Sequence, residues 1–140
     1  MLIECVNAKN ELNSRTKLIG VTMLTSFNDV LISEIGIEKS VNENVKQLTQ
    51  LAANCGMDGI VCSPLEISEV KSTHGSNLQI ISPGIRSKES SSNDQKRVVT
   101  PKQAYKNGSD WLVMGRPITK GNIKKNIQNL NDHLNKWSRD

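Results

Sequence analysis

Short, largely apolar runs alternate along this chain with longer stretches of helical periodicity. Four such runs, at residues 18–22, 59–62, 78–81 and 111–114, are each followed by sequence with helical spacing. Apolar runs of this length are typical of strands buried on both faces, and their alternation with helices indicates βα units. The pattern therefore predicts an α/β fold with four parallel strands covered by helices.

The stretches between the strands carry helix-start signals. Ser40 and Glu43 have the spacing of a capping box in front of an apolar stripe that runs from Val41 to Cys55. Further helices are expected at 28–35, at 63–72 (started by Ser63, Pro64 and Glu66), at 100–108 and at 123–137, and residues 1–17 are either a helix or an irregular lead-in.

A chain of 140 residues can form one ordinary domain, but a complete eight-fold barrel typically needs about 250 residues. The net charge of +4 is mild, and the basic residues are scattered without interleaved aromatics, which disfavours a nucleic-acid surface. No apolar stretch approaches the roughly 20 residues of a membrane span. Three cysteines without metal-like spacing and no signal peptide lead us to expect a cytoplasmic protein.

Two arginines directly follow predicted strands. Arg86 comes after Ser82-Pro83-Gly84-Ile85, and Arg116 follows Gly115. A guanidinium at the C-terminal end of a parallel strand can bind two phosphate oxygens at once, and a neighbouring glycine lets the backbone approach the ligand. A lone arginine is usually a salt-bridged surface residue, but these positions favour a phosphate site, most clearly at Arg116.

The order of these motifs resembles that of orotidine 5'-phosphate decarboxylase of the bacterial type. The resemblance runs from about Leu18 to the final helix and concerns the C-terminal half of that family. It implies that residues 1–140 are a single partial domain, the C-terminal half of a TIM (β/α)8 barrel. The matching stretches are Val21-Thr22-Met23-Leu24-Thr25-Ser26, Cys55 to Ser63, Pro83 to Arg86, Asp94 to Pro101 and Gly115-Arg116-Pro117-Ile118.

The resemblance also implies a set of nucleotide contacts. The polar stretch 87–98 has no periodicity, and in the family the equivalent segment is a mobile loop that folds over the substrate phosphate. The residues placed on the phosphate are Arg86, Gln95, Gly115 and Arg116, and those placed near the rest of the nucleotide are Leu24, Thr25 and Pro83.

Three of these residues have a simpler interpretation from the sequence alone. Thr25 and Ser26 are nearly as well explained by an ordinary turn. Pro83 marks the end of a strand, and Gln95 could be a solvated loop residue. For these three, the resemblance is what favours a role in binding.

The family removes the carboxylate of orotidine 5'-phosphate to give uridine 5'-phosphate in pyrimidine synthesis, without a cofactor or metal. A lysine and flanking aspartates carry out this chemistry from the N-terminal half, which nothing in this chain resembles. Asp94-Gln95-Lys96 is the only Asp-x-Lys sequence, and it lacks the family's further aspartate. We therefore assign no catalytic residue.

Two interpretations stay open. The chain is either one half of a split enzyme or a truncated, non-catalytic phosphate-binding remnant. The expected partners are orotidine or uridine 5'-phosphate, together with further copies of the chain or a separate N-terminal half. Neither nucleic acid nor a membrane is expected as a partner.

Overall fold

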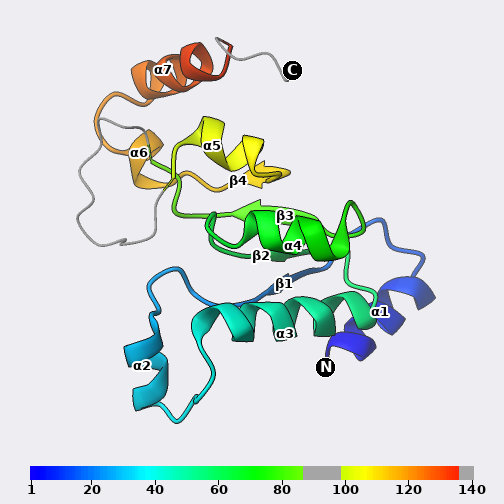
Figure 1. The fold of residues 1–140 in the computed structure, drawn as a ribbon. Helices are drawn as coiled ribbons and strands as arrows, with labels where there is room; N and C mark the ends of the chain where they lie inside the picture. The colour runs from blue at the N-terminus through cyan, green and yellow to red at the C-terminus, as the bar shows by residue number, and fades with distance from the viewer. Residues whose placement is uncertain (87–98, 136–140) are drawn as a thin grey trace.

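The computed structural model describes residues 1–86 and 99–135. Its centre is one sheet of four parallel strands, which lie side by side in chain order (Figure 1). This confirms the predicted α/β fold with parallel strands. The strands are β1 (Ile19–Val21), β2 (Gly59–Val61), β3 (Gln79–Ser82) and β4 (Trp111–Leu112).

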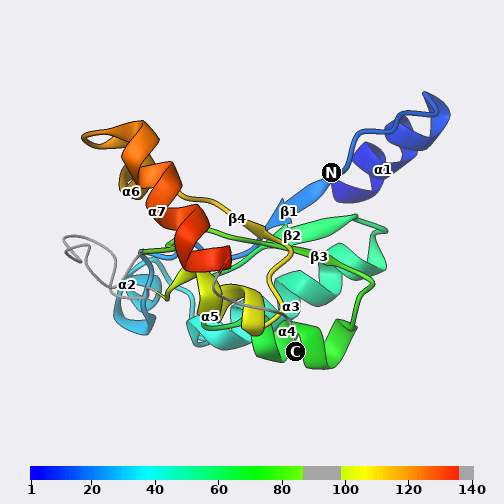
Figure 2. The same cartoon turned by 90° about the horizontal axis from the view of Figure 1, so that it is seen from above.

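Helices connect the strands and cover one face of the sheet. Figure 2 shows α3, α4 and α5 together on one side, with α1 and the α6–α7 pair at the two ends. No helix among the described residues is both long and apolar enough to cross a membrane. The helices are α1 (Leu2–Glu11), α2 (Asp29–Glu34), α3 (Val41–Asn54), α4 (Ile67–His74), α5 (Pro101–Lys106), α6 (Arg116–Thr119) and α7 (Ile123–Asn135).

The predicted start of α3 is confirmed, whereas that of α4 is wrong. Ser40 caps α3 by accepting from the Glu43 amide at 3.3 Å, and the Glu43 carboxylate accepts from the Ser40 amide at 3.0 Å. The predicted start at Ser63 is replaced by a turn, in which the Glu66 amide donates to the Ser63 carbonyl at 3.0 Å. Ser63 and Pro64 are buried where the chain leaves β2, so the helix begins only at Ile67.

The two faces of the sheet differ in burial. Ile60 and Ile80 are registered neighbours on β2 and β3, and both are fully buried. On the other face Val21 is 62% exposed, Trp111 60% and Val113 50%. The half-barrel prediction, taken alone, puts Val21, Ile60, Ile80 and Val113 all on the face that lacks an opposite wall. This is wrong for the two isoleucines, because side chains alternate along a strand and theirs point toward the helices.

Asp58 fixes the start of the sheet at its amino end. Its Oδ2 accepts from the Lys9 ammonium at 2.6 Å and from the Leu18 amide at 2.7 Å, which joins α1 and β1 to the residue before β2. The hydrogen bond from Lys9, followed by that from Leu18, holds the pKa of the Asp58 carboxyl below its usual value.

Asp110 repeats this arrangement two strands further on. Its Oδ2 accepts from the Ile80 amide at 2.8 Å and from the Lys71 ammonium at 3.1 Å. Both aspartates thus hold the amino end of the sheet together, as their position before a strand predicts.

Replacing Asp58 by asparagine should lower the free energy of unfolding by about 1–2 kcal/mol at neutral pH, because the charge that pairs with Lys9 is lost. The folded-state pKa of Asp58 lies below its unfolded value of about 3.9, so the stabilisation is complete above that pH and is lost as the pH falls through the folded pKa. Urea titrations at fixed protein concentration should show a difference that shrinks in acid. Asp132→Asn, at an exposed aspartate, serves as control. A loss of unfolding free energy in Asp58→Asn that is the same at neutral pH and in acid would contradict the assignment.

Candidate phosphate-binding site

The predicted site residues that the structure describes all follow strands at the carboxyl edge of the sheet. Because all four strands are parallel, the loops that follow them leave at this one edge. Arg86 and Arg116 follow β3 and β4, which are hydrogen-bonded neighbours. Thr25 follows β1, three strands from β4 or about 14 Å at ordinary strand spacing. The fold therefore places the two arginines on adjacent loops and the Thr25 loop at the far side of the edge.

Gly115 and Arg116 form a tight turn at the end of β4. Gly115 is the N-cap of α6, and its carbonyl accepts from the Ile118 amide at 2.9 Å and from the Thr119 amide at 3.0 Å. Pro117 has no amide hydrogen, and the Ile118 and Thr119 amides are bonded within the turn, so any backbone donor to a phosphate here has to precede Pro117. A Cβ at Gly115 would meet no atom of the described residues within 4 Å, so the turn faces away from this part of the chain.

Arg86 lies at the base of the segment that follows β3. Its amide donates to the Val99 carbonyl at 3.1 Å, and Ile85 pairs with Val99 in a parallel bridge. Its Nη1 donates to the Ile85 carbonyl at 3.2 Å, and the residue is half-buried. Gly84 has a φ of +76°, which glycine adopts without strain. The two ends of the 87–98 segment are therefore held together next to Arg86.

The loop after β1 is fixed by its first residue. Both the amide and the hydroxyl of Thr22 donate to the Val61 carbonyl, at 3.1 and 2.7 Å. A turn follows, in which the Phe27 amide donates to the Leu24 carbonyl at 3.0 Å. Leu24 is 54% exposed and Thr25 is half-buried. Leu24 therefore offers an apolar surface at this edge, and Thr25 lies within a turn, as its simpler interpretation expects.

The remaining predicted residues have different outcomes. Pro83 is half-buried between β3 and Gly84. Gln95 and the predicted loop 87–98 lie outside the described residues.

Sequence reasoning missed the part played by Val99, although a β-branched pair at the end of a polar run is a signal for a short strand. It also missed the two hydrogen bonds of Thr22. Within the described residues, no group of three His, Cys, Asp or Glu side chains could hold a metal ion.

Comparison with known proteins identifies the family. Residues 1–127 match the model of the orotidine 5'-phosphate decarboxylase / HUMPS family. The chain belongs to this family. Its curated relatives include the orotidine 5'-phosphate decarboxylase of Psychromonas ingrahamii, which is 48% identical over 118 residues, and that of Nitrosomonas eutropha, which is 45% identical over 121 residues.

The chain spans about half the length of the curated relatives it matches. The alignment covers 84% of this chain and 50% of the Psychromonas protein, and 86% and 52% for the Nitrosomonas protein. The crystal structure of orotidine 5'-phosphate decarboxylase from Lactobacillus acidophilus superposes with a TM-score of 0.70 at 35% identity, over 87% of this chain and 50% of that one. The four-stranded sheet is thus half of that family's barrel, which confirms the fold predicted from the motif order.

Proposed function

We propose that this chain is the nucleotide-binding half of an orotidine 5'-phosphate decarboxylase, which forms uridine 5'-phosphate and carbon dioxide in de novo pyrimidine synthesis. The observation that carries the proposal is the placement of Arg86 and Arg116 on adjacent loops at the carboxyl edge, beside the turn of Gly115. Two guanidinium groups there can share the oxygens of one phosphate.

The rest of the nucleotide would extend from the arginines along the carboxyl edge. Pro83 would pack against it, and Leu24 and Thr25 would meet the pyrimidine at the β1 end. The exposed apolar surface of Leu24 supports this direction. Gln95, on the segment whose ends are joined beside Arg86, would close over the phosphate.

We further propose that the lysine and aspartates of the reaction come from an N-terminal half that these 140 residues do not include. The sequence has no Asp-x-Lys-x-x-Asp, and the chain spans only about half of its relatives. The alternative, a non-catalytic phosphate-binding remnant, differs from this in one respect, because a remnant would gain no activity from a complementary half. In either case we place the chain in the cytoplasm, since three cysteines, with Cys62 buried, suit a reducing compartment.

Titration with uridine monophosphate tests the phosphate site. We expect a dissociation constant nearer millimolar than micromolar, because half of the family's contacts are missing. A hydrogen bond to a charged group contributes roughly 1.5–3 kcal/mol, so Arg116→Ala or Arg86→Ala should weaken binding at least about tenfold. Amide shifts near Gly115 report the binding. Arg15→Ala, at an exposed arginine outside this edge, is the matched control. An undiminished response in both site variants would refute the assignment.

A decarboxylation assay tests whether catalysis requires residues from an N-terminal half. The purified chain should not turn over orotidine 5'-phosphate, because electrostatic preorganisation usually supplies the largest share of rate enhancement and the charged network is missing. When the chain is mixed with the N-terminal half of a relative, the orotate absorbance should fall as the substrate is decarboxylated. Arg116→Ala should prevent this fall. Turnover by the chain alone that disappears in Arg116→Ala would overturn the claim. Failure of any mixture to react would favour the remnant.

Sedimentation tests how the open face is covered. Val21, Trp111 and Val113 expose apolar surface, which costs about 25 cal/mol per Å² in water, and parallel sheets are normally covered on both faces. We therefore expect the purified chain to associate, either with itself or with an N-terminal half. A cooperatively melting monomer at micromolar concentration would contradict this. A charged residue in place of Val21 alters only the open face and leaves the buried helix side, including Ala52, unchanged. It should shift the chain toward monomer.

A further inference from the structure

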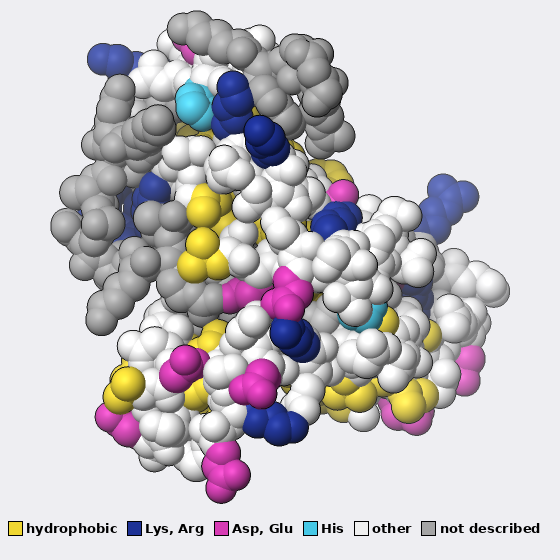
Figure 3. Space-filling model, viewed as in Figure 1, with side chains coloured by type: hydrophobic (Ala, Val, Ile, Leu, Met, Phe, Trp, Pro, Cys, Tyr) yellow, Lys and Arg dark blue, Asp and Glu magenta, His cyan; other side chains and the backbone are white. Residues whose placement is uncertain are grey.

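A groove lies between α3 and α4, on the helix-covered side of the sheet. Its volume is about 360 Å³, within the range of small-molecule sites. Acidic and basic side chains lie together over these two helices near the centre of Figure 3. The groove is separate from the carboxyl edge, because its lining comes from α3, α4 and the residue before α4. The family comparison assigns nothing to it.

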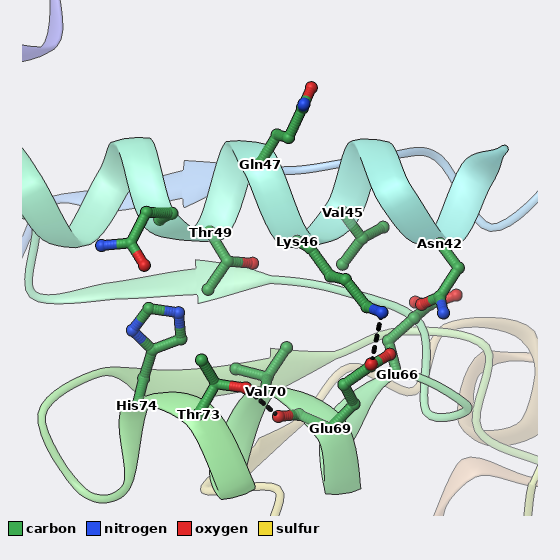
Figure 4. A pocket seen from close by; sticks show the side chains of 11 residues that line it. Asn42, Val45, Lys46, Gln47, Thr49, Glu66, Glu69, Val70, Thr73 and His74 are labelled. Carbon is green, nitrogen blue, oxygen red and sulfur yellow. Dashed lines mark hydrogen bonds and ion pairs between the residues drawn. The ribbon is translucent and has the colours of Figure 1, made fainter. Parts of the chain in front are cut away.

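The floor of the groove combines apolar side chains with one unsatisfied hydroxyl. Val45 and Val70 line it and are 1% and 4% exposed. Thr49 lies one helical turn after Val45, is 1% exposed, and points from α3 toward α4 (Figure 4). Its Oγ1 has no hydrogen-bond partner among the described residues. A buried hydroxyl without a partner costs free energy, so a ligand group or a water that bonds it is favoured.

An ion pair closes one end of the groove. The Lys46 ammonium on α3 lies 2.7 Å from the Glu69 carboxylate on α4. Hydrogen bonds from Lys46 and then Asn42 lower the pKa of Glu69. The single lysine of the lining is therefore already paired. Thr73 is also used, since its hydroxyl donates to the Glu69 carbonyl at 3.0 Å.

The other end presents hydrogen-bond acceptors. His74 is the last residue of α4 and points toward α3 in Figure 4. Gln50 lies one residue after Thr49, and its amide nitrogen donates to Asn54 at 2.8 Å, which leaves its carbonyl oxygen to accept. A helix C-terminus attracts positive charge, and α4 ends here. Of the charged side chains in the lining, Lys46 and Glu69 pair with each other at the opposite end, so the end of α4 is the feature that favours a cation here.

We propose that the α3–α4 groove binds a small aliphatic amine in its protonated, cationic form. The ammonium group has three donors, and the Thr49 hydroxyl, the Gln50 carbonyl and a ring nitrogen of His74 are acceptors at one end of the groove. The methylene chain lies over Val45 and Val70. The C-terminus of α4 disfavours an anion, and a neutral alcohol of the same length lacks the charge that this terminus attracts. The proposal does not depend on the proposed nucleotide site.

The test uses 1,4-diaminobutane as the probe, at matched ionic strength, with 1,4-butanediol and succinate as probes of equal length. Amide NMR of the full chain should show saturable shifts confined to α3 and α4 with the diamine only. Thr49→Val keeps the shape of the side chain and removes the hydroxyl, and it should weaken binding roughly tenfold. Thr73→Val is the matched control, because that hydroxyl already bonds a helix carbonyl, and it should bind as the parent does.

A second variant covers the case in which Thr49→Val disturbs the core. His74→Ala changes a half-buried rim residue and should also weaken the diamine, with an unchanged circular dichroism spectrum. Equal shifts with all three probes would show that the groove does not select a cation, and no saturable shift would show that it holds only water; either result would overturn the proposal. Shifts near Gly115 with uridine monophosphate are read in the same sample, so a failed groove and a failed phosphate site are told apart.

Discussion

An aspartate placed just before a strand, and paired with a lysine from an earlier helix, is the constraint on which this sheet depends. A parallel strand begins with amides that need acceptors, and Asp58 supplies one to Leu18 through its carboxylate. The Asp58 carbonyl also accepts from Gln79 at 3.0 Å, so this one residue ties the starts of β1 and β3 to β2. Asp110 continues the series by bonding the Ile80 amide. Register is therefore set at the amino end, where Lys9 keeps the first carboxylate charged.

Because the strand register is fixed at the amino end of the sheet, the loops at the carboxyl end do not have to set it. The Gly115 turn can face away from the described part of the chain, and the chain after Gly84 can leave the sheet and return at Val99. This division between a stabilising end and a binding end is general for parallel βα folds. It also explains why Asp58 and Asp110, although each is held by several hydrogen bonds, lie away from the proposed nucleotide site.

Much of the fold could be predicted from the sequence because its signals are local. The capping box at Ser40 and the strands near Ile60 and Ile80 depend on neighbouring residues alone. The start of α4 was misplaced because Ser63 and Pro64 resemble a helix start, while burial at the end of β2 makes them a turn. Which strand residues face the helices could not be predicted, since a nearly continuous apolar run shows no alternation. The sequence made the arginines candidates through their position after strands, but the Thr49 groove has no sequence signal, because it arises from two helices packing together.

The open face of the sheet limits what the arginines can do alone. Arg116 follows β4, the edge strand, so among the described residues only the β3 side of the sheet would border a phosphate bound there. The strength of a charge–charge interaction falls as the effective dielectric rises, so a half-open site binds an anion weakly and stabilises a developing charge even less. Protein that covers Val21 and Trp111 on the open face would therefore have two effects. It would bury their apolar surface, and it would exclude water from the carboxyl edge, strengthening contacts that are already in place.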